Sequence, residues 1–587
     1  MRAQFRSRVR LILAFLIFIA FSIVVRLYFI QIVHGEEYAL KADKQFTSGG
    51  GKLFDRGSIY FTRKDGALIS AATLATGFLV AINPQTLGDP EAAYAAITTA
   101  ASSTSLSREA FIATAAKKNQ VYIEVAHRLP EENGLALSKQ NILGVEVFRE
   151  RWRFYPGRTL AAQTIGIVSY GSGDTLAGQT GLEAAYESTL ARSGDSLYRN
   201  FFAELFSNVG DLLVSARDAR EGDLVTTIEP EVQTRLENEL AELNQRYGSK
   251  ESGGIIMNPV TGALVAIARY PSYDVNNLQS IDPVELANPL VEHVHEFGSI
   301  MKPLTMASAL DAGVITPETT YNDTGCITVN EEKICNWDAK ARGVIPMREV
   351  IVQSLNIGAS WVARQLGQDQ FRSYFMKFFG VKTGIDLPNQ SAALLSNLSK
   401  PQQIGYDTAA FGHGVAVTPV QMLRALGALA NGGVMVEPHV VGAVRLNSGI
   451  ERELDWSERT PVFSPEAARA TTGMMVAVVD EKLGGGKLKI PTMSVAAKTG
   501  TAQLTAPGGG YYSDRYFHSF TGFFPAYHPR FIILLYTNDP QGVTYASETL
   551  NATFMDLVHF LIDYYAVPPD RGLPAEGGSA SGEPTTP

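Results

Sequence analysis

Residues 296–305 read EFGSIMKPLT and place a serine, Ser299, three positions before a lysine, Lys302. On a helix, residues i and i+3 share a face, so the amine of Lys302 can reach the oxygen of Ser299 if a helix begins near Gly298. A lysine in a desolvated cleft has a lowered pKa and can accept a proton from such a hydroxyl. Because Ser-x-x-Lys also arises by chance in a chain of 587 residues, the pair predicts a nucleophile only if partner residues exist elsewhere.

Two later stretches supply such partners. QSLNIGAS contains Ser354 and Asn356, and AAKTGTAQ contains Lys498, Thr499, Gly500 and Thr501. Each stretch is a weak signal alone, since Ser-x-Asn is usual in turns and helix caps. All three in this order are not expected by chance, so we predict that they meet at one catalytic site.

The sequence around these motifs predicts an antiparallel sheet covered by helices, which is an α/β (α+β) fold. Residues 230–247 have apolar side chains at helical spacing between a proline and a glycine, which indicates a helix. Residues 253–271 and 518–539 each read as two apolar strands joined by a turn, so each predicts a hairpin. A second helix is predicted over 549–566.

Composition and cysteine content restrict the class of function. The formal net charge of -9 argues against a nucleic-acid-binding surface, which is normally basic. No Cys/His cluster has the spacing of a zinc site, and neither a metal nor another cofactor is expected. The chain has only two cysteines, Cys326 and Cys335, around a predicted hairpin. Outside the cytoplasm they can form a disulfide if their Cβ atoms face each other, and no catalytic role is expected for them.

The N-terminal sequence predicts a membrane anchor. The apolar segment over residues 11–33 has 23 residues and can span a hydrocarbon core of about 30 Å as a helix. Arginines precede it without any acidic residue, so the N-terminus is predicted to stay in the cytoplasm. A cleaved signal peptide is the alternative, but no small-x-small cleavage site follows closely. Residues from about 35 onward are then expected outside the membrane.

Composition shifts divide the remaining chain. Residues 35–221 combine short helix patterns with a strand pattern over 144–156, and they hold no acid cluster, metal ligands or phosphate-loop glycines. They predict a non-catalytic pedestal or dimerisation-type domain. The end of the chain is rich in Pro, Gly, Ser and Glu and is predicted to be disordered. The expected segments are an anchor over 1–34, the pedestal over 35–221, a catalytic domain over 222–567 and a tail over 568–587.

With its three motifs, the chain resembles the class B penicillin-binding proteins, which are peptidoglycan D,D-transpeptidases. The resemblance extends to about residue 567 and includes DRGSIYFTRKDGALIS (55–70), MNPVTGALVAIARYPSYDVNN (257–277) and FGHGVAVTPVQMLRALGALANGG (411–433). GGGYYSDRYFHSFTGFFPAYHP (508–529) is more similar to the cell-division (septal) enzymes than to the elongation enzymes. The resemblance implies a transpeptidase domain of the penicillin-binding/serine β-lactamase-like fold with a helical subdomain, preceded by a single transmembrane helix and the pedestal.

The resemblance also implies a role for each motif residue. Ser299 attacks the penultimate D-alanine carbonyl of a stem pentapeptide ending in D-Ala-D-Ala, and Lys302 takes its proton. Ser354 relays a proton to the leaving amine, and Asn356 binds the substrate amide and orients Lys302. The edge strand binds the substrate carboxylate and backbone through Lys498, Thr499, Gly500 and Thr501.

The partners that the resemblance implies are the donor stem and an amine acceptor stem, β-lactams, the membrane, a multi-spanning glycan polymerase and other division proteins. The implied location is the cytoplasmic (inner) membrane, with the catalytic domain in the periplasm. Other residues receive structural interpretations. His413, where the family often has glutamine, and His518 are predicted to be structural histidines. Arg56 is predicted to be a structural ion-pair partner, and Glu229 a solvated surface charge.

Three alternatives remain open. One is an elongation-type transpeptidase. Another is a β-lactamase or β-lactam sensor, for which class A enzymes use a glutamate in Glu-x-x-Leu-Asn; the nearest match, residues 451–455, ends in aspartate and lies in a polar stretch. A third is a non-enzymatic membrane scaffold, which the intact motifs argue against. Residues 35–225 lack the paired acids of a glycosyltransferase.

Overall fold

The computed structural model describes residues 54–101, 106–170, 176–192, 221–279 and 281–572. These residues form two compact units. The smaller unit contains residues 54–55, 74–101 and 106–152, and the larger unit contains residues 56–73, 153–170, 176–192, 221–279 and 281–572. The predicted anchor over 1–34 lies outside the described residues. Within the described ranges, no helix combines the length and the apolar character needed to cross a membrane.

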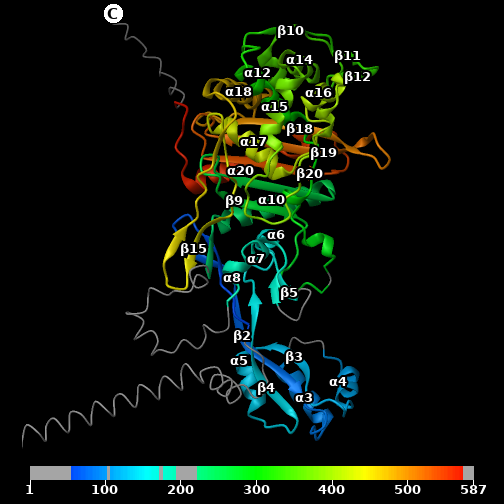
Figure 1. The fold of residues 1–587 in the computed structure, drawn as a ribbon, viewed down its shortest axis with the longest axis vertical. Helices are drawn as coiled ribbons and strands as arrows, with labels where there is room; N and C mark the ends of the chain where they lie inside the picture. Colours follow the sequence, from blue (N-terminus) through cyan, green and yellow to red (C-terminus); the bar gives the residue numbers. More distant parts are fainter. Residues whose placement is uncertain (1–53, 102–105, 171–175, 193–220, 280, 573–587) are drawn as a thin grey trace, which may run out of the picture. The chain divides into compact units, whose positions relative to one another are not determined.

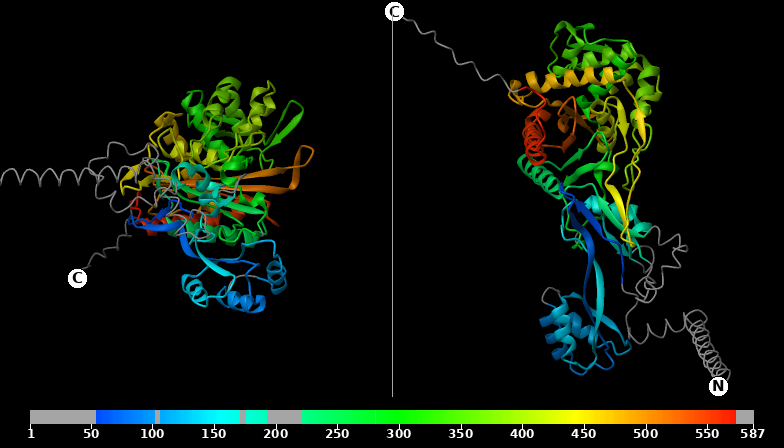
Figure 2. Two further views of the ribbon diagram at one scale, coloured as in Figure 1. Left: turned by 60° about the horizontal axis from the view of Figure 1, so that its bottom comes forward. Right: turned by 90° about the vertical axis from the view of Figure 1, so that its left-hand side faces the viewer.

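The centre of the larger unit is a five-stranded sheet in which every neighbouring pair of strands is antiparallel. Its strands, in spatial order, are β18 (Ala496–Thr505), β19 (Tyr511–Phe524), β20 (Phe531–Asn538), β8 (Glu251–Met257) and β9 (Leu264–Tyr270). Both predicted hairpins, β8–β9 and β19–β20, are therefore confirmed. Strand β18 lies at one edge, and Figure 2 shows the β18–β19 hairpin (orange) projecting from the sheet.

Helices cover both faces of this sheet (Figure 1). On one face α10 (Pro230–Tyr247) packs on β8 and β9, and α20 (Asn551–Tyr565) packs beside it, as the sequence predicts. Helix α10 begins with a proline, is capped by Glu229, and ends at Gly248 in the left-handed conformation, with φ of 58°. Glu229 is only 2% exposed, so its prediction as a solvated charge is wrong. Its carboxylate accepts the N–H of Val232, a contact that composition does not indicate.

The opposite face carries the buried helices that hold the catalytic motifs. Helix α17 (Pro419–Ala430) is buried along its whole length and starts at a capping box between Thr418 and Gln421. Beside it lie α12 (Lys302–Asp311) and α18 (Pro465–Ala477). The helical region farther from the sheet contains α13 (Met347–Val352), α14 (Asn356–Leu366), α15 (Gln368–Phe379) and α16 (Gln403–Ala409). A helical subdomain was implied by the resemblance and is present.

A second sheet of the larger unit has the strand order β16–β15–β7–β1–β2. Its strands are β16 (Glu451–Glu453), β15 (Val441–Leu446), β7 (Gly222–Thr226), β1 (Ile59–Thr62) and the first part of β2 (Leu68–Ile82). Short elements precede β7 in the chain: α6 (Ala162–Ile165), β5 (Val168–Tyr170), β6 (Leu176–Gly178), α7 (Gly181–Ala185) and α8 (Glu187–Leu190). The larger unit also contains two-stranded sheets and single-turn helices. They include β10 (Thr320–Asp323) with β13 (Gly343–Pro346), β14 (Val434–Val436) with β17 (Arg459–Pro461), α11 (Pro289–Glu292) and α19 (Ala546–Thr549).

Within the smaller unit, the later part of β2 pairs with β3 (Ile123–Leu129), and β4 (Val145–Phe154) also pairs with β2. Three helices accompany these strands, α3 (Pro90–Ala100), α4 (Arg108–Ala115) and α5 (Glu131–Ser138). Their core is formed by residues such as Val80, Ile97 and Phe111. The strand predicted over 144–156 and the short helices predicted before it are confirmed. This unit therefore folds around a core of its own.

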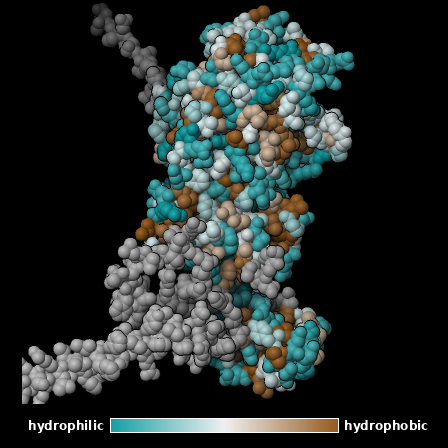
Figure 3. Space-filling view, viewed as in Figure 1, coloured by the Kyte–Doolittle hydropathy of each residue, from teal (hydrophilic) through white to brown (hydrophobic). Residues whose placement is uncertain are grey.

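Two surface features complete the description. Hydrophilic residues cover most of the face of the larger unit seen in Figure 3, with hydrophobic residues in scattered patches. Most of the tail predicted to be disordered, residues 573–587, lies outside the described residues, but its first residues bond to the rest of the larger unit: Asp570 accepts the N–H of Ser494, and Arg571 pairs with Asp480. These contacts are long-range in sequence, so a Pro- and Gly-rich composition could not indicate them.

Candidate active site

Ser299 and Lys302 lie where a short turn leads into a buried helix. Ser299 is in a 3-10 turn, η6 (Gly298–Met301), and Lys302 is the first residue of α12. The Nζ atom of Lys302 is 2.9 Å from the Oγ atom of Ser299. The predicted helical turn beginning near Gly298 is therefore present. Gly298 has φ of 59°, and a Cβ atom there would lie 2.7 Å from the carbonyl oxygen of Thr501, so this position requires glycine.

The Ser-x-Asn motif lies at the turn between α13 and α14. Ser354 has a left-handed backbone, with φ of 57°, and Asn356 is the first residue of α14. Lys302 Nζ is 2.8 Å from Asn356 Oδ1 and 2.7 Å from the carbonyl oxygen of Ser354. It is also 3.2 Å from Ser354 Oγ. The left-handed turn therefore presents both the carbonyl and the hydroxyl of Ser354 to one amine.

Lys498 reaches the same turn from the edge strand β18. Its Nζ atom is 2.9 Å from Ser354 Oγ and 3.0 Å from the carbonyl oxygen of Thr499. The hydroxyl of Ser354 thus lies between the amines of Lys302 and Lys498. The structure brings Ser299, Lys302, Ser354, Asn356 and Lys498 into one hydrogen-bonded network, although they come from three distant parts of the chain.

The other predicted residues, Thr499, Gly500 and Thr501, follow Lys498 on β18. A Cβ atom on Gly500 would lie 2.3 Å from the carbonyl oxygen of Phe297, so glycine lets β18 approach the η6 turn. The hydroxyl of Thr501 accepts the backbone N–H of Ala546. Among the described residues, the hydroxyls of Thr499 and Thr501 do not join the hydrogen bonds of the lysines. Both threonines are half-buried beside that network at the edge of the sheet.

Burial determines the charge of the two lysines. Lys302 and Lys498 are each 1% exposed. Desolvation, reinforced by the nearby charge of Lys498, holds the pKa of Lys302 well below its ordinary value. Desolvation also lowers the pKa of Lys498 to about 7. Because the charge of Lys498 lowers the pKa of Lys302 further, Lys302 gives up its proton first, and Lys498 keeps its positive charge up to a pH of about 7.

The hydrogen-bond geometry around Lys302 suits a neutral amine. The carbonyl oxygen of Ser354 and the Oδ1 atom of Asn356 can only accept hydrogen bonds. They therefore take the two N–H groups of the neutral amine, which leaves its lone pair for the hydroxyl of Ser299 at 2.9 Å. A base that faces a hydroxyl in this way can withdraw its proton.

Sequence reasoning missed a cluster beside the Ser-x-x-Lys motif. The hydroxyl of Tyr511 donates a hydrogen bond to the carboxylate of Glu296, which also accepts one from the N–H of Gly414. The ring of His413 packs against Tyr511, and its Nδ1 atom is buried without a partner among the described residues. Desolvation, with a smaller effect of Lys302, lowers the pKa of His413 to about 4, so this histidine is neutral. No spacing pattern links these residues, because they meet only through the fold.

Two exposed aromatic rings also lie by the network. Trp337 and Tyr545 are 51% and 41% exposed, and their ring centroids are 5.9 Å apart in an edge-to-face arrangement. The indole N–H of Trp337 donates to the carbonyl of Gln353, next to Ser354. Tyr545 precedes Ala546, whose N–H donates to Thr501. An aromatic pair therefore joins the Ser-x-Asn side of the site to the Lys-Thr-Gly side.

His518 has the structural role that the sequence predicts. It is fully buried, and its two ring nitrogens lie 3.0 Å from the hydroxyl of Thr549 and 2.9 Å from the carbonyl of Thr544. It is also directly opposite Thr501 in the β18–β19 pairing. Its ring thus ties the segment before α20 to the sheet edge that carries the Lys-Thr-Gly motif.

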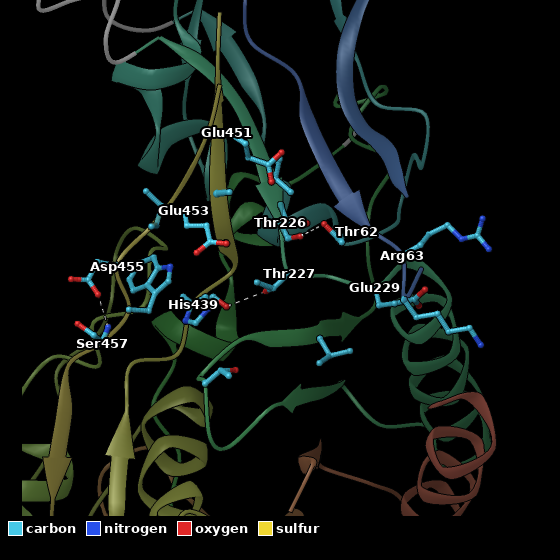
Figure 4. A pocket seen from close by; sticks show the side chains of 18 of the residues that line it. Thr62, Arg63, Thr226, Thr227, Glu229, His439, Glu451, Glu453, Asp455 and Ser457 are labelled. Atoms are coloured by element: carbon cyan, nitrogen blue, oxygen red, sulfur yellow. Dashed lines mark hydrogen bonds between the residues drawn. The ribbon is translucent and has the colours of Figure 1, made fainter. Parts of the chain in front are cut away.

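The larger unit also has a cavity of about 720 Å³ on its second sheet (Figure 4). Thr62 and Thr226 line it and are joined by a hydrogen bond, and Glu229, Glu451 and Glu453 also line it. None of the five networked residues of the motifs belongs to its lining. The glutamate considered for a β-lactamase mechanism, in residues 451–455, therefore lines a different cavity from the site of Ser299.

Comparison with known proteins agrees with this geometry. Residues 253–559 match the family model described as the penicillin binding protein transpeptidase domain. The chain is 27% identical to the probable peptidoglycan D,D-transpeptidase PbpC of Pseudomonas aeruginosa, over 73% of this chain and 74% of that protein. It is 26% identical to the peptidoglycan D,D-transpeptidase FtsI homolog of Mesostigma viride, over 77% of this chain and 79% of that protein.

Solved structures show the same fold. Penicillin binding protein 2X of Streptococcus thermophilus matches with a TM-score of 0.69 and 20% identity, covering 88% of this chain and 80% of that one. Penicillin binding protein 3 of Mycobacterium tuberculosis, in complex with aztreonam, matches with a TM-score of 0.62 and 24% identity, covering 72% of this chain and 93% of that one. The family model covers more than half of the chain. The chain therefore belongs to the penicillin-binding protein transpeptidases, in class B of that family.

Proposed function

We propose that this protein is a membrane-anchored serine D,D-transpeptidase that cross-links peptidoglycan stem peptides through an acyl-enzyme. The observation that carries the proposal is the position of Lys302 Nζ, 2.9 Å from Ser299 Oγ and held by Asn356 and Ser354. The three motifs that define the family thereby converge on one serine–lysine pair. Two similar proteins are named as peptidoglycan D,D-transpeptidases, one of them as a probable one, which supports the same reaction.

In the acylation step, Ser299 Oγ attacks the carbonyl carbon of the penultimate D-alanine while its proton moves to the neutral amine of Lys302. The hydroxyl of Ser354 is placed to pass a proton from Lys302 to the nitrogen of the leaving D-alanine. The amide bond breaks, free D-alanine departs, and an ester to Ser299 remains. The amide exchange is thus divided into two easier steps.

In the transfer step, an amine of a neighbouring stem attacks the ester carbonyl. Lys302 takes the proton that the attacking nitrogen loses, and the Ser299 oxygen regains a proton as the ester bond breaks. The cationic amine of Lys498, with the hydroxyls of Thr499 and Thr501, holds the donor carboxylate. The backbone N–H groups of Ser299 and Thr501 form the oxyanion hole, in which each donor lowers the barrier by about 3–4 kcal/mol.

The finer assignment is septal wall synthesis during division. The stretch over 508–529, after the Lys-Thr-Gly motif, supports it by resemblance. The apolar segment over 11–33 and the arginines before it support a single-pass anchor with a periplasmic catalytic domain. Residues 35–221 then serve as a pedestal, and 222–567 as the transpeptidase domain. A multi-spanning glycan polymerase and other division proteins are the partners that follow from this assignment, and β-lactams are the inhibitors.

The reaction itself can be tested with a synthetic stem pentapeptide ending in D-Ala-D-Ala and an amine acceptor. We expect one free D-alanine for every acyl-enzyme formed and a cross-linked product that mass spectrometry identifies. Ser299→Ala should abolish both products. Cross-linking that persists in Ser299→Ala would exclude this serine as the nucleophile.

The same reagents separate the transpeptidase from a β-lactamase. A transpeptidase keeps its penicilloyl ester for many minutes, and the nearest match to the class A glutamate motif, residues 451–455, lines a different cavity from the site of Ser299. A β-lactamase would release penicilloate with rapid turnover. Time-resolved mass spectrometry of the penicillin adduct distinguishes the two, and rapid loss of the adduct would favour the β-lactamase.

A further inference from the structure

A disulfide closes a small hairpin next to the site. Strands β11 (Cys326–Val329) and β12 (Glu332–Cys335) pair with Cys326 directly opposite Cys335, and the two sulfurs are bonded. The two-residue turn between them has left-handed backbones, with φ of 47° at Asn330 and 70° at Glu331. The predicted hairpin and disulfide are both present. We call residues 326–335 the disulfide hairpin.

This hairpin has little support from other strands. Within the described residues, β11 and β12 form a sheet of two strands only. Two-stranded hairpins are marginally stable in water. Val329, at the turn end, and Ile334, beside Cys335, are each 7% exposed and pack into the core, whereas both cysteines are half-buried at the open end. The open end is closed by the disulfide and by the hydrogen bond from the N–H of Asn336 to the carbonyl of Gly325, and the disulfide is the covalent one of these two links.

The open end contacts the catalytic network. The carbonyl oxygen of Cys335 accepts a hydrogen bond from Asn356 Nδ2 at 2.9 Å. The next residue, Asn336, accepts the N–H of Ile357 with its Oδ1 atom and donates its amide to both carboxylate oxygens of Asp323. Two consecutive residues thus fix the first turn of α14, where Asn356 lies.

The bond from Asn356 to Cys335 determines which way the side-chain amide faces. A backbone carbonyl only accepts, so the NH₂ group of Asn356 must face Cys335 and its oxygen must face Lys302. That oxygen then accepts one N–H of Lys302, at 2.8 Å. If the amide turned over, its NH₂ group would face the amine and compete with Ser299 for the lone pair. The Cys335 carbonyl therefore determines which group donates and which accepts in the hydrogen bonds from Asn356 through Lys302 to Ser299.

We propose that the disulfide hairpin is a positioning element for Lys302, acting through Asn356, and that acylation of Ser299 depends on the oxidised state of Cys326 and Cys335. The inference rests on the proposed function, because it concerns the base of that reaction. The cysteines touch no substrate and are positioning residues. An extracytoplasmic location, where disulfides persist, suits such a device.

Reduction by a dithiol opens the hairpin in a defined way. One thiolate of the reductant attacks a cysteine sulfur and breaks the S–S bond, and its second thiol displaces the remaining cysteine. The reductant becomes a cyclic disulfide, and its two electrons and two protons convert Cys326 and Cys335 to thiols. Val329 and Ile334 keep their packing, so the protein stays folded while the Cys335 carbonyl loses the covalent restraint on its position.

The test is the rate at which a fluorescent penicillin acylates the full-length protein before and after treatment with dithiothreitol. The chain has two cysteines, so the reductant acts on this disulfide alone. We expect a loss of roughly 10- to 100-fold in acylation rate, the effect of a small misplacement of a catalytic group. The acidic limb of the pH profile should move to lower pH. Once the Asn356 oxygen no longer accepts a hydrogen bond from Lys302, the amine of Lys302 holds its proton less tightly.

Matched variants separate positioning from stability. The double variant Cys326→Ser, Cys335→Ser should be slow and insensitive to dithiothreitol. Val329→Ala, at the turn end, should lower the thermal unfolding temperature without moving the pH profile. In Asn356→Ala, reduction should cause no further loss. If the double variant does not fold, reduced wild-type protein supplies the same comparison.

The outcomes distinguish failure of the positioning role from failure of the proposed function. Equal acylation rates and pH profiles in oxidised and reduced protein would overturn the positioning role, as would an unchanged rate loss on reduction of Asn356→Ala. If oxidised wild-type protein is not acylated at Ser299, the proposed function fails instead.

Discussion

At Lys302, burial favours the neutral amine, and hydrogen-bond geometry directs the lone pair of that amine to Ser299. Desolvation and the charge of Lys498 lower the pKa of its amine, and two acceptor-only oxygens direct its lone pair to Ser299. The sequence predicted the residues that meet here, because each motif has a recognisable spacing. It could not predict the left-handed turn at Ser354 or the contact of Asn356 with Cys335, since both depend on backbone positions far apart in the chain.

The first prediction concerns pH. The second-order rate of penicillin acylation should follow a bell-shaped profile. Below the lowered pKa of Lys302 the base becomes protonated and the rate falls. Above about 7, Lys498 loses the positive charge that binds the carboxylate, and the rate falls again. Stopped-flow fluorescence over a range of pH measures both limbs.

Lys498→Arg provides the control for this profile, because arginine stays charged at all accessible pH values. The alkaline limb should disappear in this variant, and the acidic limb should remain. A wild-type rate that rises steadily with pH would contradict the assignment of the cation to Lys498.

The second prediction concerns the bridging hydroxyl. Ser354→Gly and Ser354→Ala both remove it and should lower acylation by about 100-fold or more, the usual effect of losing a proton-transfer group. Because position 354 has φ of 57°, the glycine variant should be more stable than the alanine variant by about 1 kcal/mol. Acylation kinetics and denaturant unfolding measure the two effects separately. Near-normal acylation in both variants would exclude a proton relay through Ser354.

At the scale of elements, the site depends on how closely an edge strand approaches a turn. The helices and hairpins of the central sheet could be predicted from apolar periodicity and from Pro and Gly positions. The closeness of β18 to η6 could not, because it follows from tertiary packing around Gly298 and Gly500. The burial of Glu229 could not be predicted for the same reason. Its carboxylate accepts a hydrogen bond from the hydroxyl of Tyr564 in α20, and only the tertiary fold creates this contact.

The third prediction tests whether the close contact between β18 and η6 is needed for stability and activity. A Cβ atom on Gly500 would lie 2.3 Å from the Phe297 carbonyl and 2.4 Å from Ser519 Oγ. Gly500→Ala should therefore push β18 from η6, lowering the free energy of unfolding by about 1–3 kcal/mol and slowing acylation. Calorimetry and penicillin labelling measure the two effects.

Gly473→Ala in α18 is the matched control. Its Cβ atom would meet nothing nearer than the Tyr527 hydroxyl at 3.9 Å. Alanine favours a helix over glycine, so this variant should be neutral or more stable by up to about 1 kcal/mol. If both glycine variants acylate at the same rate as the wild type, the close contact of β18 with η6 does not matter for activity.

At the scale of the whole molecule, the larger unit contains a buried ion network remote in sequence from the motifs. The carboxylate of Glu183 is fully buried and bonds Arg56 and Arg153, each at 2.6 Å. The predicted structural role of Arg56 is thus confirmed. Its partners, Glu183 and Glu187, could not be named from sequence, because they lie 127 and 131 residues away.

The fourth prediction is that Glu183→Gln destabilises the protein by about 3–5 kcal/mol, because it leaves the buried guanidinium of Arg153 without a counter-charge and leaves Arg56 with Glu187 alone. Penicillin acylation per folded molecule should not change. The exposed pair of Glu91 and Arg108 in the smaller unit is the control, and Glu91→Gln should cost less than about 1 kcal/mol. Urea unfolding measures the free energy of unfolding of both variants. An equal loss in the two would show that burial does not determine the strength of these ion pairs.

The most direct test of the central claim, that Ser299 is a nucleophile activated by Lys302, is mass spectrometry of peptides after reaction with a fluorescent penicillin. The account predicts a single adduct on Ser299, no adduct in Ser299→Ala, and slow formation in Lys302→Ala although that variant stays folded. An adduct on another residue, or full labelling of Lys302→Ala at the wild-type rate, would contradict it.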